Sequence, residues 1–126
     1  MDYQTFIDEV RETDYVKDEE TADAAIKAVL GILASEVDEE TAHRMTDQLP
    51  EPLTYDRLRG RQQDVMGISF DENVAEFSDQ FNLREDDSVQ LIRKIYHVSK
   101  EALDPGIVWE ITESLPPEWA DEFDRA

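Results

Sequence analysis

Cysteine is absent from the 126-residue sequence, and this absence excludes several kinds of chemistry. Without a thiol the chain has no disulfide, no thiolate metal site and no cysteine nucleophile. The sequence also lacks a run of roughly 18 or more apolar residues, the length that crosses a membrane as a helix. Its opening residues, MDYQTFIDEVRETD, are acidic and unlike a secretory signal. We therefore expect a cytoplasmic protein that makes no membrane contact.

Glycine is scarce too, with four residues spread over the whole chain. No glycine-rich loop is available to surround a phosphate group, and no serine occupies a Gly-x-Ser-x-Gly sequence. The Asp-x-Asp-x-Asp-Gly spacing of a calcium loop is missing as well. The sequence consequently indicates no cofactor and no specific metal site.

Positively charged residues are few, because 12 lysines and arginines face 32 aspartates and glutamates, which gives a net charge of -20. Self-repulsion of this size destabilises a compact fold in dilute buffer. The acidic residues are dispersed, whereas a disordered acidic tail would concentrate them in one block. A dispersed acidic surface is typical of halophile proteins in molar salt, where the Debye length is about 3 Å. We expect a halophilic source and diffuse cation association, with an ordinary acidic protein as the alternative.

The shortage of positive charge also argues against nucleic-acid binding, which requires a basic patch to neutralise phosphates. The densest basic cluster is formed by Arg57, Arg59 and Arg61, and Asp56 and Asp64 flank it. Such a cluster is typical of a solvated loop or of contacts with carboxylates of the same chain. We expect no nucleic-acid partner and keep the three arginines as candidates for a protein contact.

Strand patterns are weak throughout, because no stretch alternates polar and apolar residues over six positions with β-branched enrichment, and no Asn-Gly or Asp-Gly pair marks a hairpin. Apolar residues instead recur at spacings of three and four, the period of a helical face. We expect helices at about 2–12, 19–35, 39–48, 70–81 and 85–102, one between Asp104-Pro105 and Pro116, and turns after the prolines near 53–58 and 118–123. The sequence therefore predicts an all-α fold.

Two long stretches of the chain are alike. A constant shift of 66 positions places Ile26 on Ile92 and the pair Leu49-Pro50 on Leu115-Pro116. Helical segments often share a hydrophobic period, but they rarely share the spacing to a terminal Leu-Pro as well. We interpret the match as an internal duplication.

This duplication predicts a single domain, residues 1–126, built as a helical bundle of two tandem three-helix repeats. Repeat one covers about 2–60, a link covers about 61–68, and repeat two covers about 69–126. We expect the two long helices to pack on each other about a pseudo-twofold axis.

The clearest catalytic motif is Glu40-Thr41-Ala42-His43, since a Glu-x-x-His step puts both side chains on one helical face, as in di-iron bundles. Such a site needs a second step, but Gly106 and Trp109 stand at the matching positions. His97 lies on a predicted helix close to the apolar stripe of that helix. The sequence contains no nucleophile or orienting motif for it. We expect His43 to be partly exposed, His97 to lie at the rim of the core, and neither to be catalytic.

Two aromatic residues near the end of the chain, Trp119 and Phe123, lie four positions apart and share a helical face. Most aromatics at this spacing belong to the core, but aromatics also anchor interfaces. We keep both as candidates for an interaction groove or a dimer contact.

Several of these features together resemble a bacterial and archaeal family known as domain of unknown function 2267. The resemblance depends on Phe6, the apolar face from Ala22 to Leu33, Gln48-Leu49-Pro50, Leu115-Pro116 and Glu118-Trp119. Ser114 stands where Gln48 would repeat. The resemblance implies a small helical protein with a repeated unit ending in Gln-Leu-Pro, and it supplies no catalytic residues.

Two stacked amphipathic repeats without a catalytic constellation favour a non-enzymatic protein that binds another protein or associates with itself. The alternative is a small-molecule or metal-dependent enzyme with its site between the repeats, which would use His97 or the pair Glu40 and His43. A third possibility is a regulator that docks on a basic partner.

Overall fold

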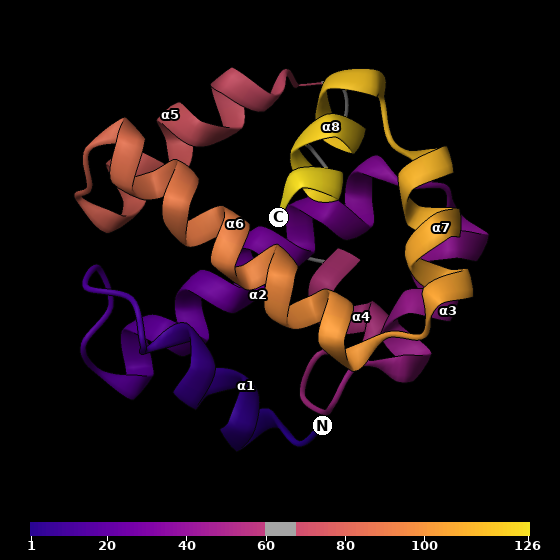
Figure 1. Ribbon diagram of the computed structural model, residues 1–126, viewed down its shortest axis with the longest axis horizontal. Coiled ribbons are helices and arrows are strands. Elements are labelled where there is room, and N and C mark those ends of the chain that lie inside the picture. Colours follow the sequence, from indigo (N-terminus) through magenta and orange to yellow (C-terminus); the bar gives the residue numbers. More distant parts are fainter. Residues whose placement is uncertain (60–67) are drawn as a thin grey trace.

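A computed structural model describes residues 1–59 and 68–126, and within these ranges it contains α-helices and no strand. The helices, in chain order, are α1 (Tyr3–Val10), α2 (Glu19–Glu36), α3 (Glu39–Gln48), α4 (Tyr55–Arg59), α5 (Phe70–Phe81), α6 (Glu85–Ala102), α7 (Pro105–Ser114) and α8 (Pro117–Arg125) (Figure 1). The predicted all-α class is confirmed. None of the described helices combines the length and the apolar character needed to cross a membrane.

The segments after the prolines form helices α4 and α8, where the sequence predicted only turns. Each described half therefore contains four helices, one more than the three-helix repeat that the sequence predicted. Helix α8 forms because Pro117 lies in its first turn, where the fixed φ of proline fits and its missing N–H is not needed. The short helix α4 begins where the Arg57 N–H donates to Thr54 Oγ1 over 3.3 Å.

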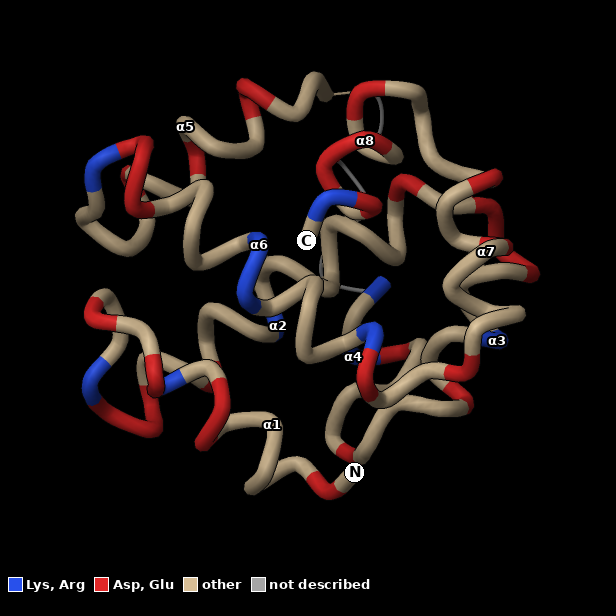
Figure 2. Tube along the Cα trace, viewed as in Figure 1, with Lys and Arg blue, Asp and Glu red and all other residues tan. Residues whose placement is uncertain are grey.

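Polar side chains begin most of the helices at the predicted places. The N–H group three residues on donates to Asp2, Asp18, Asp38, Ser69 and Asp104 at 2.7–3.0 Å. These bonds satisfy backbone groups that lack a partner inside the helix. Acidic residues extend well beyond these caps and lie on most of the helices (Figure 2).

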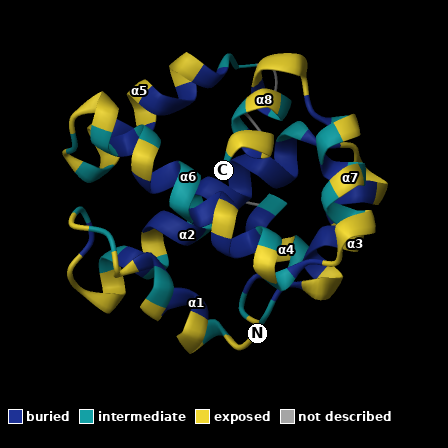
Figure 3. Ribbon diagram, viewed as in Figure 1, coloured by how far each residue is buried: buried dark blue, intermediate teal, exposed yellow. Residues whose placement is uncertain are grey.

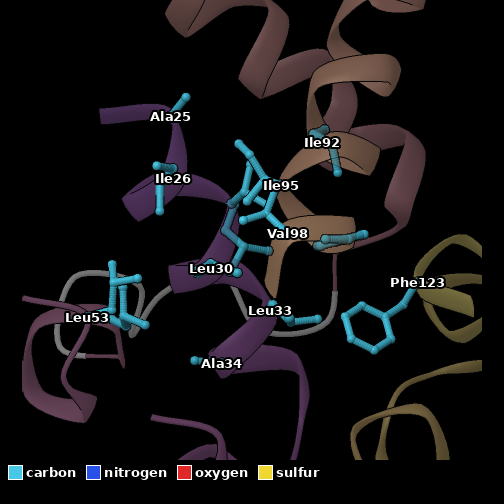
Figure 4. Close-up of a cluster of buried hydrophobic side chains, with 14 of the residues drawn as sticks. Ala25, Ile26, Leu30, Leu33, Ala34, Leu53, Ile92, Ile95, Val98 and Phe123 are labelled. Atoms are coloured by element: carbon cyan, nitrogen blue, oxygen red, sulfur yellow. The ribbon is translucent and has the colours of Figure 1, made fainter. Parts of the chain in front are cut away.

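The core lies around α2, which contacts α1, α3, α4 and α6. From Val29 to Ser35 every residue of α2 is buried, so this part of the helix is enclosed on all sides (Figure 3). Leu30 of α2 points toward Ile95 and Val98 of α6 (Figure 4). The two long helices thus meet in the core, as predicted.

Helices α3 and α7 join the two halves through reciprocal contacts. Gln48 Nε2 donates to Asp104 Oδ2 over 2.5 Å, and the Asp104 N–H donates to Gln48 Oε1 over 2.9 Å. At the other end of the pair, the Asp38 N–H donates to Ser114 Oγ over 2.8 Å, and that hydroxyl donates to Asp38 Oδ2 over 3.1 Å. The N-terminus of each helix therefore meets the C-terminus of the other, so the pair is antiparallel.

The residues in these contacts are related by the same 66-position shift. Asp38 corresponds to Asp104, and Gln48 corresponds to Ser114. Each half thus caps the other at equivalent positions, which is the exchange that a twofold axis produces. Ser114, which breaks the repeated Gln-Leu-Pro motif, nevertheless takes the place of Gln48 in this exchange. Arg44 and Glu110 are also counterparts, and they form an ion pair at 2.6 Å.

The symmetric relation between the halves does not extend to the first helix of each half. Helix α1 contacts both α2 and α6, whereas α5 packs chiefly on α6. Most of the predicted link, residues 61–67, lies outside the described residues. Its last residue, Ile68, accepts a hydrogen bond from Trp119 Nε1 through its carbonyl over 3.3 Å.

Candidate functional site

The structure buries both aromatics that were considered as interaction residues. Trp119 is 2% exposed and packs edge-on against Phe70, with 5.3 Å between ring centroids. Phe123 is 0% exposed and lies edge-on to Tyr96, also at 5.3 Å. They therefore pack in the core, the more common role of aromatics at helical spacing, and Trp119 also lines a hollow.

Two of the three candidate arginines lie within the described residues. Arg57 is exposed on α4, and the Arg59 guanidinium lies 5.8 Å from the centroid of the Tyr55 ring. Arg61 lies outside the described residues. The same Tyr55 ring stacks on His43, with 3.6 Å between centroids and 13° between planes.

The histidines and the Glu-x-x-His step each have separate partners. Glu40 pairs with Arg44 at 2.5 Å, whereas His43 is exposed and stacks on Tyr55. His97 is exposed, not at the rim of the core, and its Nε2 lies 3.5 Å from Glu101. Across residues 1–59 and 68–126, no group of three or more histidine, aspartate or glutamate side chains could hold a metal ion.

Trp109 on α7 is the exposed aromatic, with 64% of its surface accessible. In the sequence, Trp109 is the counterpart of His43 and one of the aromatics that can anchor an interface, although the two aromatics near the end of the chain were the preferred candidates. A shift of 66 positions aligns Trp109 with an exposed position of α3, away from the apolar face of Ile107 and Ile111. A single exposed hydrophobic residue is common on protein surfaces, but tryptophan is also enriched among the residues that dominate binding energy at interfaces.

Trp109 borders a groove between α3 and α7, with a volume of about 230 Å³. The other lining residues are Asp38, Glu40, Thr41, Arg44, Glu110, Glu113 and Ser114. Arg44 is the single cation of this lining, and it already pairs with both Glu40 and Glu110. The hydrogen bond that Arg44 donates to Glu110, followed by the nearby charges of Glu110 and Glu40, raises the pKa of Arg44, so its charge persists. The groove therefore places an indole ring beside an excess of carboxylates.

Two further hollows lie elsewhere in the described residues. One, of about 440 Å³, is lined by Glu36, Glu72 and Glu118 beside Trp119. The other, of about 420 Å³, lies between the loop after α1, helix α6 and the end of α8. These three hollows of the described chain differ in charge. Several cationic side chains line only the hollow of about 420 Å³.

The fold defines a small all-α protein in which helices α3 and α7 of the two halves cap each other. The chain belongs to the family described as uncharacterized conserved protein (DUF2267), whose sequence profile matches residues 3–122. The resemblance drawn from the Gln-Leu-Pro motif and the apolar faces is thereby confirmed. Comparison with curated proteins and with solved structures gave no match.

Proposed function

We propose that this protein is a non-enzymatic interaction module that binds a protein partner through the surface around Trp109. The exposure of this indole, 64%, is the observation that supports the proposal. Among the described large hydrophobic residues, only Met1 is similarly exposed, at 48%. A partner would remove the indole from water, and tryptophan is the residue type that most often dominates binding energy at interfaces.

The charges beside Trp109 favour a basic partner. Asp38, Glu40, Glu110 and Glu113 line the adjacent groove, and Arg44 is the only cation that faces them there. A lysine or arginine from a partner can place its aliphatic stem on the indole and its charge among these carboxylates. A second copy of this chain would bring another net charge of -20, so self-association is opposed until salt screens the repulsion.

The alternative, an enzyme with a site between the repeats, has weaker support. The groove between α3 and α7 does lie between the two halves, but the residues proposed for catalysis do not meet there. Glu40 is held by Arg44, and His43 stacks on Tyr55. His97 is on α6 beside Glu101.

A lysine-rich helical peptide tests the proposal directly. We expect saturable binding to the wild type and roughly tenfold weaker binding to Trp109→Ala, because a loss of about 1.4 kcal/mol is usual for an anchoring aromatic. Glu113→Gln should weaken binding as well. Asp121→Asn, which makes the same change of charge at an exposed position of α8, is the matched control and should bind like the wild type.

Equal binding by the wild type, Trp109→Ala and Asp121→Asn would contradict the proposal, since it would indicate attraction to the net charge alone. Analytical ultracentrifugation tests the remaining possibility, self-association through the same surface. A wild type that dimerises in 2 M KCl, together with a monomeric Trp109→Ala, would identify a second copy of the chain as the partner.

We also propose that the protein is adapted to high salt and attracts cations diffusely. The net charge of -20 and the spread of acidic residues over most helices support this proposal (Figure 2). Raising KCl from 0.1 to 2 M shortens the Debye length from about 10 Å to below about 3 Å and weakens self-repulsion. We expect the melting temperature to rise by roughly 5 °C or more. A flat response would contradict the proposal.

A further inference from the structure

The hollow between the α1–α2 loop, α6 and the end of α8 departs from the acidic character of the molecule. Its lining includes the cations Arg93, Lys94 and Arg125 and the carboxylates Glu12 and Asp14. Over the whole chain the acidic residues outnumber the basic ones by 32 to 12, yet cations outnumber side-chain carboxylates in this lining. Figure 2 shows the basic residues of α6 close to the basic end of α8.

The three cations come from two helices and keep unused bonding capacity. Arg93 donates through Nε and Nη2 to one oxygen of Glu122, at 3.1 and 2.9 Å, which leaves Nη1 available. Lys94 has only a long contact of 3.4 Å to Glu12, whose side chain is 67% exposed. Ion pairs of this kind contribute little and are easily exchanged. Arg125 is exposed and forms no ion pair with the described residues.

Two glutamates partly neutralise Arg93 and Lys94, whereas Arg125 has no ion-pair partner among the described residues. An added anion would therefore meet at least one uncompensated cation in this hollow. Guanidinium groups present a planar set of N–H donors that matches the oxygens of phosphates and carboxylates. Gln90 and Tyr15 also line the hollow and add an amide and a phenol as neutral hydrogen-bonding groups. The volume, about 420 Å³, is within the usual range of small-molecule sites.

We propose that this hollow binds a small oxyanion, the phosphate or carboxylate group of a small molecule. Lys94 and Arg125 contact the anion directly, with Nη1 of Arg93 as a third donor. Arg93 also holds Glu122, so it fixes α8 against α6 at the same time. The site is separate from the surface around Trp109, and neither depends on the other.

Nuclear magnetic resonance tests the proposal with two probes, inorganic phosphate and malonate, at an ionic strength held constant with KCl. We expect saturable shifts of the amide signals of Tyr15, Gln90 and Lys94 with at least one probe. Arg125→Gln and Lys94→Gln should each weaken that binding about tenfold, since each removes a charge-assisted hydrogen bond. Malonate and phosphate titrations together distinguish a carboxylate ligand from a phosphate ligand.

Arg57→Gln is the matched control, because Arg57 is an exposed arginine on α4 and its replacement changes the net charge equally. It should bind the probes like the wild type. A linear, non-saturating response to both probes would overturn the proposal. So would an equal loss of affinity in Arg57→Gln and Arg125→Gln, because it would assign the effect to net charge.

Discussion

Helices α2 and α6 occupy corresponding places in the two halves, each with 18 residues, but their surroundings differ. The second half of α2 is enclosed, and all residues from Val29 to Ser35 are buried. Helix α6 keeps a polar face, on which His97 is exposed at the position that matches buried Gly31. The same hydrophobic repeat therefore serves two purposes: α2 forms the centre of the core, and α6 gives the chain a side that meets solvent.

The third helices of the two halves differ in a similar way. Their exposed faces carry His43 on α3 and Trp109 on α7, at matching positions. By contrast, the ends at which α3 and α7 meet cap each other through equivalent hydrogen bonds. The parts that hold the halves together are thus equivalent, whereas the parts that face outward have diverged.

The largest effect should follow from moving a residue of α6 into α2. Ala34, which is 0% exposed, corresponds to Lys100, whose amine lies 5.2 Å from the Phe123 ring and donates to the Asp124 carbonyl over 3.2 Å. Ala34→Lys places a charge in the enclosed helix and should cost about 4 kcal/mol or more in urea unfolding. The reverse change, Lys100→Ala, should cost under about 1 kcal/mol. Similar losses would mean that the two helices have equivalent surroundings.

A smaller effect tests the reciprocal caps. Gln48→Ala and Ser114→Ala each remove the side-chain hydrogen bonds that reach the opposite helix, and each should lower the melting temperature by about 3 °C. The two ends of a 10-residue helix are about 15 Å apart, so the double variant should show the sum of the two losses. Gln4→Ala, which removes only a bond within α1, is the control. Strong coupling between the two changes would argue against independent caps.

The smallest effect concerns the two aspartates. The pKa of Asp104 is lowered first by the Gln48 side chain and next by the Ile107 N–H, whereas that of Asp38 is lowered mainly by Thr41, with a lesser contribution from Ser114. Gln48→Ala should therefore raise the pKa of Asp104 more than Ser114→Ala raises that of Asp38. Carboxyl carbon shifts in a pH titration measure both values. Equal changes would contradict the ranking of causes.

The lowered pKa values also set the direction of the acid response. Because the folded-state pKa lies below the unfolded value of about 3.9, each cap contributes its stability above that pH. The contribution is lost as the pH falls through the folded-state pKa. Gln48→Ala should therefore weaken the acid dependence that Asp104 contributes, whereas Ser114→Ala should have less influence on Asp38.

Most helix boundaries were predictable because the signals that begin a helix are local. Asp18, Asp38 and Asp104 cap helices within three residues of their own position. The pairing of α3 with α7 was not predictable in the same way, since its hydrogen bonds join residues 56 and 76 positions apart. The duplication predicted related halves but did not identify the surface that joins them.

The candidate sites were harder to predict, for two physical reasons. Trp119 and Phe123 have the spacing of either a core stripe or an exposed stripe, and only packing separates these roles. The hollow proposed to bind an oxyanion combines side chains such as Tyr15, Lys94 and Arg125, which lie on three segments far apart in sequence. No local motif marks such a site, because folding alone brings its residues together.

The pair Arg44 and Glu110 bears on the internal duplication that the sequence predicts. In a dimer of identical chains, a residue on the symmetry axis meets its own copy, so arginine would face arginine and glutamate would face glutamate. Here the counterparts carry opposite charges and lie 2.6 Å apart. Covalent fusion of the halves permits this, because each position is encoded separately. Joining the halves therefore replaces a repulsion that symmetry would impose with an attraction.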